Sequence, residues 1–269
     1  MFEKIEKRIA FYRIRNYIRL CKMLASNNLV PELISQPKKG KILVLAPHMD
    51  DEVIGCGGTL YRSVLAGGDV TVVYMTDGRR GDPELEGKDI SKEERRTLED
   101  RLVDLRKKEA QIAASIIGIK DLIFLDEPDM ELNAKKGNII NMVDILERIK
   151  PDVVYLPFLT DNHPDHWQTN RIFVEALKKT PLSFDCFGYE AWSPIYPNCM
   201  IDIGDAVEVK KQALEKFKSQ LKHNNYINSI LSLNSYRSMV HLKGEGYVEA
   251  FFAATSKEYL SLYSYLCRK

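Results

Sequence analysis

Short apolar runs alternate with longer segments of helical periodicity along most of this chain. The apolar runs have the length of strands buried on both faces of a sheet, and they span 42–46, 70–75, 121–125, 153–156, 183–190 and 247–254. The segments between and after them have helical spacing or helix-start signals, and they predict helices at 53–65, 91–117, 138–149, 168–179 and 257–266. Strands alternating with helices indicate βαβ units and right-handed crossovers. We therefore predict an α/β fold, with a Rossmann-like, mostly parallel sheet flanked by helices.

The first 40 residues do not follow this alternation. Residues 1–27 carry an untidy apolar stripe on an otherwise basic segment, which predicts an N-terminal helix. The stretch from Asn27 to Gly40 contains two prolines and is typical of a linker. We expect two parts, an extension and linker at 1–40 and one domain at 41–269. The basic helix could touch a membrane surface, but packing on the domain with a solvated face is favoured.

Composition excludes several classes of protein. Of the 269 residues, 45% are hydrophobic and 29% are charged, and the formal net charge is +1, so no global charge points to a nucleic-acid partner. Five cysteines are scattered without a CxxC pair, which favours reduced thiols and a cytoplasmic protein. No apolar run has the length of a transmembrane helix, and the charged N-terminus lacks a signal-peptide core.

Candidate chemistry is concentrated in the turn after the first buried strand. Pro47 ends the apolar run, and His48, Asp50, Asp51 and Glu52 follow before the helical pattern begins. Such a turn lies at the carboxyl edge of a parallel sheet, where ligands bind. A helix N-terminus explains one or two acids, but it does not explain the histidine. Imidazole and carboxylate together indicate a metal site.

A second turn of the same kind follows the run at 153–156. It carries His163, Asp165 and His166, so three of the five histidines of the chain fall in the two turns. Catalytic zinc takes three protein ligands and leaves one position for water. His48, Asp51 and one of the two later histidines would supply that set and leave Asp50 free as a base. The same ligands also suit ferrous iron.

These motifs resemble those of a known family. His48-Met49-Asp50-Asp51-Glu52, then Gly55-Cys56-Gly57-Gly58-Thr59 and much later His163-Pro164-Asp165-His166, are similar to the LmbE-like family of zinc de-N-acetylases, which includes the N-acetylglucosaminyl-phosphatidylinositol de-N-acetylase. The resemblance extends over about 41–220, with Met49 where the family usually has proline. It implies zinc held by His48, Asp51 and His166, and activated water that attacks the amide carbonyl. Asp50 would then be the general base, and His163 the oxyanion donor or acid.

The resemblance also implies a small-molecule substrate, an N-acetylglucosamine-type sugar or its conjugate. Arg79 and Arg80 follow the second strand and could bind sugar hydroxyls or a phosphate. Asp129 follows the third strand, and Trp192 could stack on a sugar ring. Each of these residues could equally be an ordinary loop or packing residue. The motifs leave the aglycone and the oligomeric state open.

Two other functions remain on the sequence alone. An amidase that cuts another amide would share every motif and differ only in its pocket loops. A non-catalytic sugar- or nucleotide-binding module is disfavoured, because the ligand set and Asp50 are intact. In addition, the glycines from Gly55 to Gly58 do not fit G-x-G-x-x-G.

Overall fold

A computed structural model describes residues 30–85 and 89–266. In these residues eight strands form one sheet, in the order β1-β7-β8-β6-β5-β2-β3-β4. All neighbouring strands are parallel except β8, which is antiparallel to both β6 and β7. The predicted Rossmann-like, mostly parallel sheet is therefore confirmed. The strands are β1 (Glu32–Ile34), β2 (Lys41–Ala46), β3 (Asp69–Thr76), β4 (Asp121–Glu127), β5 (Val153–Pro157), β6 (Asp185–Tyr189), β7 (Cys199–Asp202) and β8 (Val248–Thr255).

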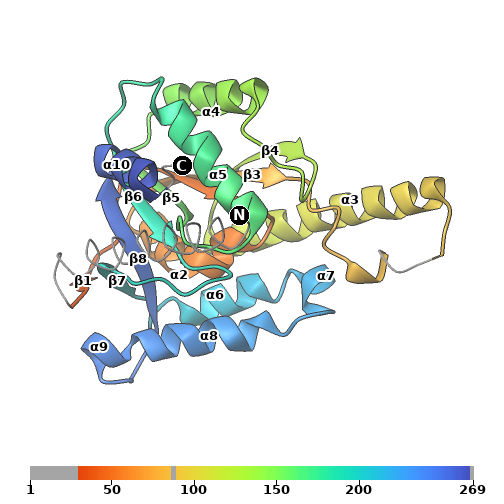
Figure 1. Ribbon diagram of the computed structural model, residues 1–269. Helices are drawn as coiled ribbons and strands as arrows, with labels where there is room; N and C mark the ends of the chain where they lie inside the picture. Colours follow the sequence, from red (N-terminus) through yellow and green to blue (C-terminus); the bar gives the residue numbers. More distant parts are fainter. Residues whose placement is uncertain (1–29, 86–88, 267–269) are drawn as a thin grey trace, which may run out of the picture.

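Helices cover both faces of the sheet (Figure 1). One face carries α2 (Asp51–Leu65), α3 (Lys92–Ile117), α6 (Val207–Leu214) and α8 (Tyr226–Arg237), with the short elements η1 (Pro83–Leu85), α7 (Lys218–Leu221) and α9 (Met239–Leu242) nearby. The other face carries α4 (Lys136–Ile149), α5 (Pro164–Leu177) and α10 (Ser256–Leu266). The central strand β2 shows why: Ile42 and Val44 enter one core, while Leu43 and Leu45 enter the other.

The helix boundaries follow from local chemistry. The side chain of Ser91 accepts a hydrogen bond of 3.1 Å from the backbone N–H of Glu94 at the start of α3, as a capping box predicts. Gly118, with φ of 90°, ends that helix in the left-handed conformation. The predicted start of α5 at residue 168 was wrong. Helix α5 begins four residues earlier because Pro164 suits the first helical position and His163 caps the helix.

Two strands, β1 and β7, lie in segments for which no strand is predicted. Strand β1 lies in the segment 27–40 that was predicted as a linker, and it pairs with β7, so this part of the linker belongs to the sheet. Both strands are short, and their pairing joins segments far apart in the chain, which local periodicity does not reveal. The predicted helix at 1–27 lies outside the described residues.

The sheet brings the two candidate turns together. Strands β2 and β5 are direct parallel neighbours, and β3 lies on the other side of β2. Their carboxyl ends therefore share one edge, at which the side chains after Ala46, Thr76 and Pro157 meet. Within the described parts of the chain, we find no helix long and apolar enough to cross a membrane.

Candidate active site and metal centre

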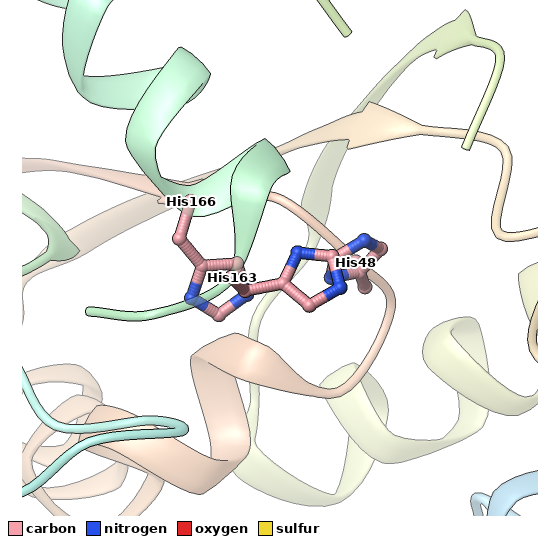
Figure 2. Close-up of side chains that lie close together, drawn as sticks. All are labelled: His48, His163 and His166. Atoms are coloured by element: carbon pink, nitrogen blue, oxygen red, sulfur yellow. The ribbon is translucent and has the colours of Figure 1, made fainter. Parts of the chain in front are cut away.

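Three histidine rings meet at this edge. Figure 2 shows His48 from the turn after β2 beside His163 and His166 from the start of α5. The ring centroids of His48 and His163 are 4.6 Å apart, those of His163 and His166 are 4.9 Å apart, and those of His48 and His166 are 5.4 Å apart. The fold thus joins the two motifs that lie more than a hundred residues apart in the sequence.

The carboxylate of Asp51 lies between two of these rings. Its Oδ2 atom is 3.2 Å from Nδ1 of His48 and 3.2 Å from Nε2 of His166. The same oxygen accepts a 2.8 Å hydrogen bond from the backbone N–H of His48. Asp51 is the first residue of α2, so the start of this helix positions its carboxylate, while the end of β2 positions the ring of His48.

Further buried carboxylates surround the histidines. Nε2 of His48 is 3.2 Å from Oδ2 of Asp165 and 3.3 Å from Oδ1 of Asp129, and Nδ1 of His166 is 3.2 Å from Oδ1 of Asp161. Two groups of three side chains could each hold a metal ion. In each group every residue offers one ligand atom, and these atoms lie within 4.8 Å of one another. The first group is His48, His163 and His166, and the second is His48, Asp129 and Asp165.

The charge balance of this cluster fits a bound cation. Burying several carboxylates together is costly unless positive charge compensates them. His166 is fully buried, and neither of its ring nitrogens has a hydrogen bond of good geometry. Burial lowers the pKa of His166, but Asp51 and Asp161 outweigh it and raise the pKa to about 9. The two buried ring nitrogens of His166 face carboxylates that need a positive charge, and imidazole nitrogen with carboxylate oxygen is a zinc-type donor set.

Asp50 stands apart from the ligand cluster. Its backbone has φ of 154° and ψ of −25°, a strained conformation for a residue with a side chain. Burial raises the pKa of Asp50 to about 7, and the attraction of Arg106 opposes that shift. The nearest guanidinium nitrogen of Arg106, Nη2, is 3.7 Å from Oδ2 of Asp50. A carboxylate with a pKa near neutrality suits proton transfer at physiological pH.

The tautomer of His163 is set by the start of α5. The backbone N–H of Asp165 donates a 3.3 Å hydrogen bond to Nδ1 of His163. Burial and then the neighbouring His48 and His166 lower the pKa of His163. A neutral ring that accepts at Nδ1 carries its proton on Nε2. His163 can therefore donate a hydrogen bond from Nε2.

A cavity of about 530 Å³ opens above these residues. Asp50, Asp51, His48 and His163 line the end of the cavity at the sheet edge. The other lining residues come from several elements, and they are Ile54, Arg80, Gly81, Pro83, Arg106, Asp129, Met130, Ala191, Trp192, Gln220, Asn224, Asn225, Tyr226, Ser229 and Ile230. This volume is in the ordinary range for a small-molecule site.

The residues predicted to contact substrate separate into two groups. Arg80, Asp129 and Trp192 line the cavity, and the ring of Trp192 is 6.2 Å from that of His163 between centroids. Arg79 is not among the lining residues of this cavity. Its Nε donates a 2.6 Å hydrogen bond to Oδ2 of the buried Asp77. Arg79 is therefore paired within its own loop and does not line this cavity, whereas its neighbour Arg80 does.

Sequence reasoning missed the role of Arg106. The charges along α3 are of mixed sign, a pattern typical of a solvated face, but the Arg106 side chain is only 4% exposed and lines the cavity. Its guanidinium donates to the backbone carbonyls of Gly78 (3.1 Å) and Met49 (3.2 Å). One signal was present: Arg106 shares the helix face of the buried Leu102, Ala110 and Ala113, where a charge needs a partner.

Fold and site together define the class of the protein as an α/β enzyme with a candidate metal-binding site at the carboxyl edge of the sheet. The model of the PIG-L family, described as GlcNAc-PI de-N-acetylase, matches residues 43–177, half of the chain. The chain belongs to this family. The matched segment contains both histidine turns and every residue of the two candidate metal-binding groups.

Individual relatives agree with the family match. The chain is 30% identical over 198 residues to a diacetylchitobiose deacetylase of Thermococcus kodakarensis, which covers 67% of this chain and 70% of that protein. The solved structure of the N,N'-diacetylchitobiose deacetylase from Pyrococcus horikoshii, complexed with its inhibitor MPG, is similar with a TM-score of 0.66 and 26% identity, over 81% of this chain and 85% of that chain. The 4-carboxy-2-hydroxymuconate hydratase GalB of Pseudomonas putida shares the fold at a TM-score of 0.66 and 22% identity, over 81% of this chain and 96% of that chain.

Proposed function

We propose that this protein is a metal-dependent hydrolase that removes the N-acetyl group from an N-acetylglucosamine-type sugar or its conjugate. One observation carries the proposal: Asp50 lines one end of a sugar-sized cavity together with His48, Asp51 and His163, within the segment matched by the deacetylase family. The relatives whose names specify an activity on N-acetylated sugars support the same reaction class.

His48, Asp51 and His166 are the proposed metal ligands. Asp51 is in contact with both imidazoles through a single oxygen, so small rearrangements would let all three side chains meet one ion. Asp161 and Asp165 contact the outer nitrogens of the two rings and would orient them as ligands. We propose zinc as the ion, with ferrous iron as the alternative that the donor set also suits. The chemistry that a bound zinc ion supplies is polarisation of the amide carbonyl and acidification of a water molecule.

Asp50 is the proposed general base. It accepts the proton of the attacking water, and it then returns that proton to the nitrogen of the leaving amine. Its pKa near neutrality allows both directions of transfer. Arg106 attracts the carboxylate of Asp50 through charge, and this attraction limits how far burial can neutralise the carboxylate.

His163 is the proposed donor to the carbonyl oxygen. Since its Nδ1 accepts from the backbone of Asp165, the N–H at Nε2 is available to hydrogen-bond the oxygen on which negative charge develops. Asp129 and Arg80 are proposed to bind sugar hydroxyls, and Trp192 is proposed to contact a sugar face at the mouth of the cavity.

Acetate release from N-acetylglucosamine and from N,N'-diacetylchitobiose tests the function. The purified full chain, loaded with zinc, should release acetate from at least one of these sugars. Excess chelator should abolish the release, and added zinc should restore it. A zinc-loaded, folded protein that releases no acetate from an N-acetylated sugar would refute the proposal.

A further inference from the structure

Helix α2 contains a break that divides it into two pieces. Cys56 has φ of −145° and ψ of 16°, outside the helical range, so the first turn, 51–55, and the remainder of the helix are separate pieces. The first turn begins with Asp51, and Asp50 lies immediately before it. Because both residues belong to the candidate site, the direction of this turn decides where their carboxylates lie.

A buried ion pair connects the two pieces. In a regular α-helix the backbone N–H of Gly58 donates to the carbonyl of Ile54, four residues earlier. In α2 this N–H donates to Oε1 of Glu249 over 3.0 Å. The Ile54 carbonyl accepts from Nζ of Lys210 over 2.8 Å, and the same Nζ donates to Oε1 of Glu249 over 2.7 Å. The pair thus joins the two backbone groups that a regular helix would join directly.

The carboxylate of Glu249 also caps the second piece of the helix. Its Oε2 atom accepts a 2.8 Å hydrogen bond from the backbone N–H of Thr59, next to the bond that Oε1 accepts from Gly58. A negative charge at this position suits the positive end of the helix dipole. A side chain that inserts into the ladder of backbone hydrogen bonds kinks a helix. The pair therefore fixes the angle between the two pieces.

Stability alone does not account for a lysine and a glutamate at these positions. Lys210 on α6 and Glu249 on β8 are both fully buried. A buried ion pair often stabilises a fold no more than apolar side chains of similar volume would. The backbone groups at the break, in contrast, need one donor and two acceptors, because an unpaired buried N–H or C=O is costly. The pair supplies all three.

The first turn is also held closely against the sheet. The hydroxyl of Tyr74 on β3 donates a 2.7 Å hydrogen bond to Oε1 of Glu52. A Cβ atom at Gly55 would lie 2.2 Å from Cδ2 of Tyr189 on β6, so only glycine allows this approach. The turn therefore has one fixed position beside the strands, and the pair sets its direction relative to the rest of α2.

We propose that Lys210 and Glu249 are positioning residues that aim the first turn of α2, and with it the carboxylate of Asp51. That carboxylate then reaches the rings of His48 and His166. Neither Lys210 nor Glu249 lines the cavity, and both lie beyond residue 177, where the match to the family model ends. This inference rests on the ligand role of Asp51 in the proposed function.

Zinc affinity of the full chain, measured by competition with a chelator under conditions in which each variant is folded, tests this role. The test protein combines Lys210→Met with Glu249→Met, which replaces the pair by apolar side chains. Its free energy of unfolding in urea should be closer to that of the wild type than that of Lys210→Met alone, because no charge stays buried without a partner. Its zinc affinity should still fall at least about tenfold, as is typical when a group that orients a metal ligand is lost.

Leu146→Ala is the matched control for lowered stability. Leu146 is fully buried on α4, which covers the other face of the sheet and ends just before β5 begins, so this side chain lies toward the edge opposite the site. The variant should lose stability through a cavity and keep zinc affinity within about twofold. Wild-type zinc affinity in the double variant would overturn the proposal, and so would an equal loss of affinity in Leu146→Ala.

Glu249→Gln covers the case in which the double variant does not fold. Its amide oxygen can accept from one backbone N–H, but its NH₂ group cannot accept from the other. Zinc affinity should therefore fall in this variant as well, by a smaller factor than in the double variant. Unchanged affinity in Glu249→Gln would overturn the proposal.

A crystal structure of the same variants without zinc separates this inference from the proposed function. The 3.2 Å contact between Oδ2 of Asp51 and Nε2 of His166 should be lost when the pair is replaced, and its retention would overturn the positioning role. A wild-type protein that binds zinc but releases no acetate would refute the deacetylase function alone. The loss of that contact and of zinc affinity in the variants would still support the positioning role.

Discussion

Replacing Asp50 by asparagine removes the proposed general base and keeps the shape of the side chain. The pKa of about 7 means that, at neutral pH, roughly half of the Asp50 carboxyls are able to accept a proton before any cation binds. A bound cation would lower this pKa and increase the fraction. General-base catalysis contributes about a hundredfold to ten-thousandfold in rate. The variant should therefore lose that factor in kcat, equivalent to about 2.7–5.4 kcal/mol of transition-state stabilisation.

The assay is acetate release at saturating disaccharide, with metal content measured on the same preparation. Zinc should stay bound in Asp50→Asn, because the proposed ligands are His48, Asp51 and His166. Wild-type kcat/KM should fall as pH decreases through the pKa of Asp50, since the base works only when deprotonated. The residual activity of the variant should lack that acidic limb.

Asp104→Asn is the matched control, since Asp104 is exposed on α3, and it should keep full activity. Full activity of Asp50→Asn with zinc bound would refute the assignment of the base. Loss of zinc from the same variant would instead show that Asp50 is a ligand and that the proposed ligand set is wrong.

Three further predictions concern the metal and the core. His166→Ala should lose zinc, whereas His163→Ala should retain it and lose activity; stoichiometric zinc in His166→Ala, measured by elemental analysis, would contradict the ligand set. Apparent zinc affinity should rise with pH up to about 9, because His166 has a raised pKa and must lose its proton before it can bind the ion. Competition with a chelator at several pH values measures this affinity, and an affinity that does not change with pH would contradict the prediction. Lys210→Met should lower the free energy of unfolding in urea by about 3–5 kcal/mol, because Glu249 stays buried without its 2.7 Å partner. Lys178 pairs with Glu175 at the surface, so Lys178→Met is the control and should lower the free energy of unfolding by less than about 1 kcal/mol. Equal losses in the two variants would refute the argument that burial makes the Lys210–Glu249 pair important.

The centre of the fold and the two histidine turns could be predicted from the sequence because both depend on local pattern. A strand buried on both faces needs an uninterrupted apolar run, and the run at 42–46 shows it directly. Parallel strands place their carboxyl ends at one edge, so the side chains after two such runs could be expected to meet. The structure brings His48, Asp51 and His166 together as that reasoning requires.

Only the tertiary structure decided the features that depend on contacts between distant segments. Strand β8 lies between β6 and β7 and is antiparallel to both, and β1 pairs with β7. The periodicity of a segment predicts a strand but does not tell which other strand it pairs with. Arginine is usually a surface residue, yet the turn after β2 and the loop after β3 supply Arg106 with the carbonyl acceptors of Met49 and Gly78, which make its burial favourable.

The same physical reason separates the neighbours Arg79 and Arg80. Both are basic residues of one loop, and the sequence treats them alike. Asp77 fixes the first away from the cavity, while the second lines it. Local pattern therefore determined which side chains are candidates for the chemistry. Long-range packing determined which of them face the cavity.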